Sequence, residues 1–370
     1  MKILITGVNG FIGKNLQSHL AERKDIEVLS FSFKDDASYL HKLLKDIDFI
    51  FHLAGVNRPL DTELFKSNSI CTQKLCEEIQ KSGRKIPVIY TSSIQAELKN
   101  NYGVSKKDAE ESLIRYHEKF GNPIHIFRLP NVFGKWAKPN YNSVVATFCH
   151  NISHEIPIQI DNAEKVLTLV YIDDLIQRFI QLIDDPDKNE NRLKFEDVSP
   201  KYSITIEKLA EQIITFKKSR LNLTIERVGK GLVRALYSTY ISYLPISEFK
   251  YEIPLFVDAR GSFVEILKTP DCGQLSYFKA SPGITRGGHY HHSKTEKFIV
   301  VKGKACFKFK NLITNERYDF YTDGNKPEVI ESVPGWSHDI TNIGDGELIV
   351  ILWANEVYNK FNPDTYPSLL

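Results

Sequence analysis

The sequence predicts an α/β fold with a doubly wound parallel sheet, followed in the same chain by an all-β fold. Over roughly the first 240 residues, short apolar runs alternate with helical patterns, which is typical of a parallel sheet covered by helices. After about residue 250 the helical periodicity fades, and short strand-like runs separated by Pro-Gly and Gly-Asp-Gly turns dominate. This second pattern indicates an antiparallel barrel or jelly roll.

The length agrees with two domains, because domains usually hold on the order of 100 to 200 residues and this chain has 370. We place the boundary near residues 243–254, a stretch with two prolines, and expect domains at 1–245 and 246–370. In the first domain we expect helices at 11–23, 64–81 and 102–120, and strands at 2–6, 27–31, 48–53, 87–92 and 124–129. In the second domain we expect strands at 263–267, 297–301, 305–309, 328–332 and 348–353.

Charge and composition exclude several classes of protein. The 48 basic and 46 acidic residues give a net charge of +2, so nothing favours a nucleic-acid or membrane-surface partner. No run of about 18 apolar residues is present, and Gly7 comes too early for the apolar region of a signal peptide. We therefore expect a cytoplasmic protein with reduced thiols. The cysteines are Cys71, Cys76, Cys149, Cys272 and Cys306.

A glycine-rich turn, Gly7-Val8-Asn9-Gly10-Phe11-Ile12-Gly13, follows the first expected strand. Glycines at this spacing permit a tight turn and let the backbone approach a pyrophosphate at a helix N-terminus. Alone, the motif is explained equally well by a plain glycine turn. Its place between the first strand and the first helix is the context that dinucleotide binding requires. We therefore expect a Rossmann-type domain that binds NAD(P).

A tyrosine and a lysine four residues apart, Tyr102 and Lys106, lie on one face of an expected helix. The pKa of a free tyrosine is near about 10, and a neighbouring ammonium lowers it by favouring the phenolate. Ser93, which follows the strand expected at 87–92, could hydrogen-bond a substrate oxygen. Together the three side chains would form a proton relay suited to hydride transfer. The plain alternative is a surface tyrosine beside a solvated lysine.

These features resemble the extended short-chain dehydrogenase/reductase family over about residues 1–240. Further motifs of that family stand here as HLAG at 52–55, Asn68, TSS at 91–93 and RLPNVFG at 128–134. The resemblance implies Ser93, Tyr102 and Lys106 as the catalytic residues. It implies a substrate site near Arg128 and Asn131, and cofactor contacts from Gly7, Asn9, Gly10, Phe11, Ile12, Gly13, Leu53, Ala54, Gly55 and Lys106.

Two departures from that family narrow the expected chemistry. Ile94 and Gln95 stand where nucleotide-sugar 4,6-dehydratases carry an Asp-Glu pair, so dehydration is not expected. NAD-specific members end the second strand with an acid for the ribose 2′-hydroxyl, whereas this strand leads into Ser30–Lys34. The missing acid and the nearby Lys34 favour NADPH as the cofactor. NAD stays possible, because Asp35 and Asp36 are close by.

Three histidines and a glutamate form the main pattern of the second half. They occur as Gly283-x5-His289-x-His291-x4-Glu296-x6-Gly303, and then as Gly335-x2-His338-x3-Asn342. Imidazoles and a carboxylate are standard ligands for a divalent transition metal. In a strand His289 and His291 would point to one face. A lone histidine is more often an ordinary surface or core residue, but four such residues at these separations indicate a metal site.

The spacing of these ligands resembles the cupin family, although the proline of its second motif is shifted by one in Val333-Pro334-Gly335. The resemblance implies one divalent ion, with zinc preferred, held by His289, His291, Glu296 and His338. Two further stretches, 258–265 and 286–289, resemble signatures of 4-keto-sugar 3,5-epimerases and imply that Arg286 contacts substrate. In those epimerases the histidine equivalent to His289 is a free base, and the full ligand set here favours the ligand role instead.

The whole chain resembles a family of bifunctional capsular polysaccharide synthesis enzymes, including its stretches at 140–144, 236–240 and 355–366. The resemblance implies a homodimer that epimerises C3 of a UDP-linked 4-keto-6-deoxy-HexNAc sugar in the cupin. NADPH-dependent reduction at C4 would follow, because reduction destroys the acidity on which epimerisation depends. The implied product is UDP-N-acetyl-6-deoxy-L-talosamine, a precursor of UDP-N-acetyl-L-fucosamine.

Two alternatives stay open from the sequence. In one, the chain is a nucleotide-sugar reductase whose cupin is a non-catalytic module for sugar binding or dimerisation. In the other, the first domain is a 4-epimerase with tightly held NAD. The C3 base also stays open, with His292 and Lys294 as candidates.

Overall fold

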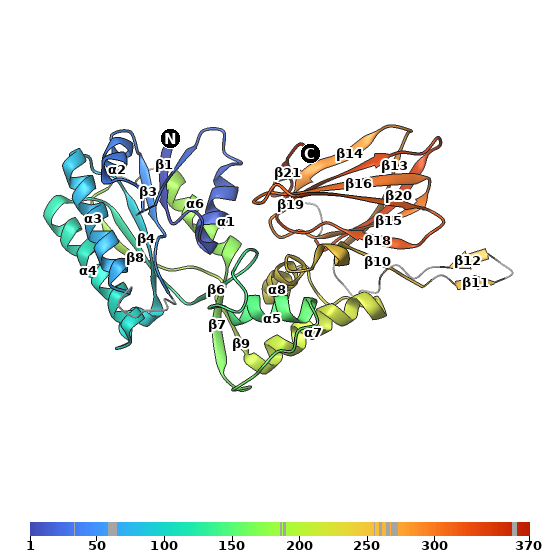
Figure 1. Cartoon of the computed structure of the whole chain (residues 1–370), viewed down its shortest axis with the longest axis horizontal. Coiled ribbons are helices and arrows are strands. Elements are labelled where there is room, and N and C mark those ends of the chain that lie inside the picture. Colours follow the sequence, from blue (N-terminus) through green and yellow to red (C-terminus); the bar gives the residue numbers. More distant parts are fainter. Residues whose placement is uncertain are drawn as a thin grey trace. The chain divides into compact units, whose positions relative to one another are not determined.

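The computed structural model shows two compact units, which we describe one at a time (Figure 1). It describes all residues except 33, 58–64, 186, 188–189, 255, 259–260, 264–266, 268–272 and 357–360. Unit 1 comprises Met1–Ser143 and Thr168–Ser203, and unit 2 comprises Val144–Leu167 and Ile204–Leu370.

Unit 1 is built on a six-stranded parallel sheet with the strand order β2-β1-β3-β4-β5-β8. These strands are β1 (Lys2–Thr6), β2 (Glu27–Phe31), β3 (Phe49–His52), β4 (Val88–Ser93), β5 (Ile124–Leu129) and β8 (Leu193–Glu196). Its helices are α1 (Phe11–Leu20), α2 (Ala37–Leu44), α3 (Lys66–Ser82), η2 (Ile94–Glu97), α4 (Asn101–Phe120) and α6 (Ile172–Asp184). A short sheet orders β6 (Asn131–Phe133), β7 (Val166–Tyr171) and β9 (Tyr202–Thr205). The α/β fold expected from the sequence is thus confirmed.

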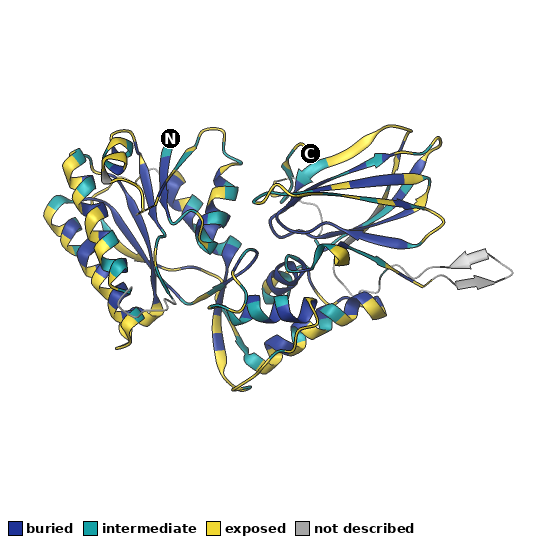
Figure 2. Ribbon diagram, in the orientation of Figure 1, coloured by how far each residue is buried: buried dark blue, intermediate teal, exposed yellow. Residues whose placement is uncertain are grey.

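Helices cover both faces of the sheet, as Figure 1 shows, and successive side chains along each strand point alternately to the two faces. On one face, Leu4 and Val88 pack in a buried cluster with Leu75 of α3 and Leu113 of α4. On the other face, the rings of Phe51 and Phe127 lie 5.2 and 5.1 Å from the ring of Phe179 on α6. Because both faces are covered, the central strands β1, β3, β4 and β5 are buried almost throughout, as their dark colour in Figure 2 shows.

Helix ends in unit 1 follow local capping chemistry. Asn100 caps α4 by accepting a hydrogen bond from the Gly103 amide at 2.8 Å, and Gly121 ends that helix with φ +69°. The expected helix at 11–23 is shorter in the structure, because α1 ends at Leu20 and a turn follows. Such differences of a few residues are usual at helix ends.

Unit 2 contains two five-stranded antiparallel sheets, which confirm the all-β expectation for the second half (Figure 1). One sheet orders β10 (Lys250–Glu252), β18 (Glu328–Glu331), β15 (Glu296–Lys302), β20 (Leu348–Ala354) and β13 (Gln274–Ala280). The other orders β17 (Arg317–Asp323), β16 (Lys304–Asn311), β19 (Trp336–Asn342), β14 (Thr285–Tyr290) and β21 (Tyr366–Pro367). In addition, β11 (Phe256–Asp258) pairs with β12 (Gly261–Phe263) in the antiparallel sense. The strand expected at 263–267 falls mostly outside the described residues.

The described part of unit 2 also contains the helices α5 (Val144–Ser153), α7 (Ile206–Asn222), α8 (Gly231–Ile241) and η3 (Ile246–Phe249). A buried ion network ties α7 to the first of the two sheets: Glu331 of β18 contacts both Arg220 of α7 and Lys297 of β15. Removing one member would leave a buried charge uncompensated, so the network holds the helix in register with the strands. Residues 204–245 therefore pack with the strands that follow them, and the domain boundary at 245 stays a prediction.

No helix among the described residues has both the length and the apolar character needed to cross a membrane.

Candidate functional sites

The glycine turn of unit 1 is shaped by close backbone contacts that exclude side chains. Gly7 has φ +76°, and a Cβ there would lie 2.6 Å from the amide nitrogen of Ala54. A Cβ on Gly13 would lie 2.3 Å from the carbonyl oxygen of Gly7. Gly10 is the N-cap of α1 and offers no side chain to its first turn. The amides at this helix N-terminus are therefore arranged as a phosphate site requires.

A chain of buried hydrogen bonds, which the sequence analysis did not identify, holds the segment after β3. The His52 ring bonds the Thr6 hydroxyl at 2.8 Å through Nδ1 and the Thr72 hydroxyl at 2.9 Å through Nε2. Burial lowers the pKa of His52 to about 3, so the ring is neutral near pH 7. Asn68 accepts from the Val56 amide at 2.7 Å and donates to the Val56 carbonyl at 3.0 Å. These bonds place Leu53, Ala54 and Gly55 against the glycine turn.

The three expected catalytic residues of unit 1 come together at the end of β4 and the start of α4. Tyr102 and Ser93 share a side-chain hydrogen bond, and the Lys106 Nζ lies 6.0 Å from the centre of the Tyr102 ring. Lys106 is buried and donates to the Thr91 carbonyl at 2.9 Å. A Cβ on Gly55 would lie 3.2 Å from the same Nζ, so the glycine leaves room for the lysine.

Burial controls the ionisation of this group. It lowers the pKa of Lys106 to about 8, against a smaller opposing effect of Glu110. Burial also raises the pKa of Tyr102, and the hydrogen bond with Ser93 offsets this only in part. The net pKa of Tyr102 therefore lies above its usual value, contrary to the lowering expected from a neighbouring ammonium, because desolvation is the largest effect on the hydroxyl.

Arg128, expected near substrate, is held by two carboxylates. It contacts Glu110 and Glu97 at 2.7 Å each and stacks on the ring of Phe195 at 4.7 Å. Glu110 also accepts a short hydrogen bond from Ser92. The substrate role of Arg128 stays a prediction, since these contacts already account for its orientation.

Other residues singled out in unit 1 have local roles in the structure. Asn131 is exposed and donates to the Thr168 carbonyl at 3.3 Å, so its contact with substrate stays a prediction. Asp35 accepts from the Ser32 amide at 2.8 Å, and Asp36 caps α2 through the Ser38 amide at 2.7 Å. Both acids are thus engaged in turns near the end of β2.

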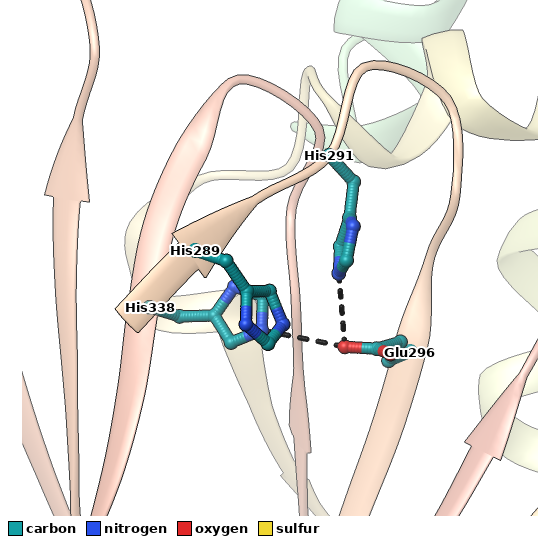
Figure 3. A group of neighbouring side chains, drawn as sticks. All are labelled: His289, His291, Glu296 and His338. Carbon is teal, nitrogen blue, oxygen red and sulfur yellow. Dashed lines mark hydrogen bonds and ion pairs between the residues drawn. The ribbon is translucent and has the colours of Figure 1, made fainter. Parts of the chain in front are cut away.

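In unit 2 the structure brings His289, His291, Glu296 and His338 together (Figure 3). Their ligand atoms all lie within 4.8 Å of one another. Glu296 Oε2 is 3.0 Å from Nε2 of His291 and 3.3 Å from Nε2 of His338. His289 and His338 come from the neighbouring strands β14 and β19, His291 from the loop after β14, and Glu296 from the first residue of β15.

The charge balance of this cluster suits a cation. Burial alone would raise the pKa of Glu296, but the charge of His291 and hydrogen bonds from His291 and His338 hold it well below its usual range. Burial and the two neighbouring histidines lower the pKa of His289 to about 4. A carboxylate beside three imidazoles is the donor set that a divalent transition metal takes. The four residues therefore fit the expected ion.

A β-bulge brings Arg286 to the same face of the sheet as His289. On β19, His338 and Ile340 are two residues apart and both buried, so they share a face. The register pairs His289 with His338 and Arg286 with Ile340, with a shift between Gly287 and His289. The Arg286 guanidinium is exposed and stacks 4.9 Å from the Phe278 ring of the other sheet. This position is compatible with the predicted substrate contact.

The two candidates for the C3 base have different surroundings. Lys294 is buried and donates to the Pro363 carbonyl at 3.0 Å and to the Thr365 hydroxyl at 2.5 Å. The ring of His292 lies 5.4 Å from Tyr290 and 5.0 Å from Tyr366. The first epimerase-like signature, 258–265, lies in part outside the described residues.

Comparison with known proteins covers the whole chain. A model of the NAD dependent epimerase/dehydratase family matches residues 3–196, and a model of the polysaccharide biosynthesis C-terminal domain matches residues 256–366. The chain is 56% identical over 367 residues to a UDP-2-acetamido-2,6-beta-L-arabino-hexul-4-ose reductase of Pseudomonas aeruginosa, covering 99% of this chain and 98% of that protein.

Solved structures agree with this result. The crystal structure of the capsular polysaccharide assembling protein CapF from Staphylococcus aureus matches with a TM-score of 0.66 and 38% identity, over 100% of both chains. A UDP-glucuronic acid 4-epimerase from Bacillus cereus, 22% identical, matches 59% of this chain and 84% of its own with a TM-score of 0.52. At that identity the second match shows the fold alone.

Proposed function

Since the chain belongs to the NAD dependent epimerase/dehydratase family, we propose that it is a bifunctional nucleotide-sugar enzyme that epimerises C3 of a UDP-4-keto-6-deoxy-HexNAc and then reduces C4. The observation that carries the proposal is the presence of two complete sets of side chains in one chain. One is the Ser93, Tyr102 and Lys106 set in unit 1, and the other is the buried His/Glu cluster in unit 2. The relative named as a 4-ulose reductase, aligned over nearly the full length, supports the substrate class.

The reductive half is assigned to unit 1. When bound at the glycine turn, NADPH supplies the hydride for C4. Tyr102, hydrogen-bonded to Ser93, stands as the proton donor to the C4 oxygen, and its pKa above the usual value keeps it protonated near pH 7. Lys106, a cation below pH about 8, orients the reacting groups from beneath the tyrosine and restores its proton. NADPH is preferred because β2 lacks a terminal acid and because Asp35 and Asp36 are engaged in turns.

The epimerising half is assigned to unit 2, whose fold we take to be a cupin. The four ligands would hold a divalent cation, with zinc preferred, and such an ion stabilises negative charge that develops on a keto oxygen. His289 serves as a ligand rather than as a free base, because its ring lies 4.8 and 5.0 Å from the rings of the other two histidines. Lys294 donates to Pro363 and Thr365, and both Lys294 and His292 stay candidates for the C3 base.

The order of the two steps follows from the substrate. A 4-keto group acidifies the proton at C3, and reduction at C4 removes that acidity. Epimerisation must therefore come first. The implied product is UDP-N-acetyl-6-deoxy-L-talosamine for capsule or O-antigen synthesis, and the homodimer and the cytoplasmic location stay predictions from the sequence.

Deuterium exchange tests the proposal. We expect the enzyme, given a UDP-4-keto-6-deoxy-HexNAc in deuterated water without NADPH, to place deuterium at C3 and leave C4 unreduced. Adding NADPH should then give a reduced sugar that keeps the deuterium. Reduction without deuterium at C3 would leave unit 2 as a non-catalytic module. Tightly held oxidised NAD in the purified protein would instead favour a 4-epimerase.

A further inference from the structure

Residues 363–368, which we call the 363–368 segment, lie against the strands that carry the histidines of the cluster. Within this segment β21 pairs with β14, where Pro367 is opposite His289. The Ser368 amide donates to the Gly288 carbonyl at 2.8 Å. The Ser368 carbonyl accepts from the hydroxyl of Ser337, the neighbour of His338, at 3.1 Å. The segment therefore contacts both strands that supply ligands from the second sheet.

The contact with His291 is direct. Nδ1 of His291 lies 2.6 Å from the Asp364 carbonyl oxygen, which can only accept. Nδ1 therefore donates to this carbonyl, which leaves Nε2, 3.0 Å from Glu296 Oε2, as the ring atom that can bind an ion. A partner of this kind fixes both the tautomer and the direction of a metal-binding imidazole.

The side chain of Asp364 holds the loop that carries His291. Its carboxylate accepts from the backbone amides of His292, Ser293 and Lys294 at 2.9, 2.9 and 2.6 Å. Asp364 has φ +39°, in a region that aspartate, asparagine and glycine tolerate better than other residues. The backbone at this position is thus shaped so that one residue offers both its carbonyl and its carboxylate to the loop.

Further bonds fasten the same loop from two sides. Lys294 donates to the 363–368 segment, as described above. From α8, Ser238 donates to the Ser293 carbonyl, and Arg234 donates to the Ser293 hydroxyl. Asn355 exchanges hydrogen bonds with the backbone of Thr295 at 2.9 and 3.0 Å. The loop between the ligands His291 and Glu296 is thereby fixed along its length.

We propose that Asp364 is a positioning residue of the metal centre, which sets the tautomer and place of His291 so that the four ligands converge before an ion binds. The proposal rests on the metal-binding role given above to His289, His291, Glu296 and His338. Three described residues of the stretches 236–240 and 355–366 support it. Ser238, Asn355 and Asp364 in these stretches all bind the same loop.

Cobalt(II) provides a probe, since its absorption spectrum reports the geometry of its ligands. In the full-length chain, Asp364→Asn keeps the side-chain size and the tolerance of positive φ but turns one acceptor into a donor facing backbone amides. We expect this variant to bind Co²⁺ about 10- to 100-fold more weakly than wild type, the usual effect of losing a partner of a metal ligand. Its Co²⁺ spectrum should shift, and the melting temperature of the metal-free variant should change little.

A matched control and a second variant complete the experiment. Asp323→Asn alters another turn carboxylate of unit 2, which accepts from the Asn325 amide at 2.7 Å, and should leave Co²⁺ binding unchanged. Asp364→Gly keeps the backbone conformation while removing the carboxylate, and should weaken Co²⁺ binding in the same way. Lys294→Met removes two hydrogen bonds to the 363–368 segment and should weaken Co²⁺ binding by a smaller factor. If Lys294 acted only as the C3 base, its loss would leave Co²⁺ binding unchanged.

Two results would overturn the proposal, and they are distinguishable. Wild-type affinity and spectrum in both Asp364 variants would show that the residue does not position the ligand, while the metal centre itself stands. A wild-type protein that binds no Co²⁺ or Zn²⁺ would remove the metal centre and, with it, this role for Asp364.

Discussion

The glycine turn of unit 1 and the metal cluster of unit 2 both depend on segments far apart in the sequence, but the contacts differ in kind. At the turn, the backbone of Gly7 lies so close to Ala54 that no side chain fits between them. At the cluster, His291 is placed by a hydrogen bond to the backbone of Asp364, seventy-three residues later. Steric contacts of the first kind tolerate no added atom, whereas contacts of the second kind can be weakened one bond at a time.

This difference in the kind of contact predicts which substitutions impair each site. A methyl group at the turn must displace backbone on which the cofactor depends. A substitution among the hydrogen-bond partners of the cluster should leave the sheets in place and weaken the binding of the ion. The following predictions use this contrast, and they run from the largest expected effect to the smallest.

Removing a ligand should have the largest effect. His338→Ala deletes one of four ligands, and we expect zinc affinity to fall by more than the roughly 10- to 100-fold typical of indirect partners. C3 exchange should fall with it, and unit 2 should melt earlier, because binding energy adds to folding energy. Elemental analysis and calorimetry measure both. His150→Ala, which alters a histidine of unit 2 outside the cluster, should retain the ion; loss of metal in that control would argue against a specific site.

Crowding the turn should come next. Gly7→Ala adds a Cβ at 2.6 Å from the Ala54 amide nitrogen, and strain of about 1–3 kcal/mol corresponds to roughly 10- to 100-fold weaker NADPH binding. Gly83→Ala is the matched control, because Gly83 also has positive φ, at +69°, yet no described atom lies within 4 Å of its added Cβ. Fluorescence titration with NADPH should separate the two variants. An equal loss of NADPH affinity in both would show that positive φ, and not the contact with Ala54, causes the loss.

The pH dependence should distinguish the two half-reactions. Burial lowers the pKa of Lys106 to about 8, so the lysine is a cation below that pH and loses its charge above it. NADPH oxidation should therefore decline as pH rises through about 8, by up to tenfold per pH unit. C3 exchange, which does not use Lys106, should show no break there. A reductive rate that stays level to pH 10 would remove the lysine from the relay.

The smallest effect concerns cofactor choice. Lys34→Ala removes an exposed charge near the end of β2, and such contacts contribute at most about 1 kcal/mol. The preference for NADPH over NADH should fall by about two- to five-fold, whereas Lys45→Ala should leave it unchanged. Steady-state kinetics with both cofactors measure this preference. A wild-type enzyme that uses NADPH and NADH equally would instead favour Asp35 and Asp36 as contacts of the ribose.

Sequence reasoning succeeded where the signal is local or periodic. The strand–turn–helix from Lys2 to Leu20 is contiguous, and the spacing of His289, His291 and Glu296 is short, so these features were predictable. It failed where the outcome depends on burial or on distant partners. The raised pKa of Tyr102 reflects desolvation, which spacing cannot express.

Residues that are distant in the sequence and meet only in the folded chain had weak sequence signals or none. The bond between Thr6 and His52 connects two strands, and each residue alone has an ordinary environment in the sequence. The bulge that turns Arg286 toward the face of His289 has one hint, the Gly287-Gly288 pair. Asp364 lies in a stretch whose resemblance was noticed, but its contact with His291 required the register of β21 on β14.

The central claim is that the two chemical steps use separate groups, with proton exchange at C3 in unit 2 and reduction at C4 in unit 1. Tyr102→Phe removes the hydroxyl of the proposed proton donor and changes nothing in unit 2. In deuterated water with a UDP-4-keto-6-deoxy-HexNAc, this variant should lose NADPH oxidation by about 10²- to 10⁴-fold and keep wild-type deuterium incorporation at C3. Loss of deuterium incorporation together with reduction would contradict the account.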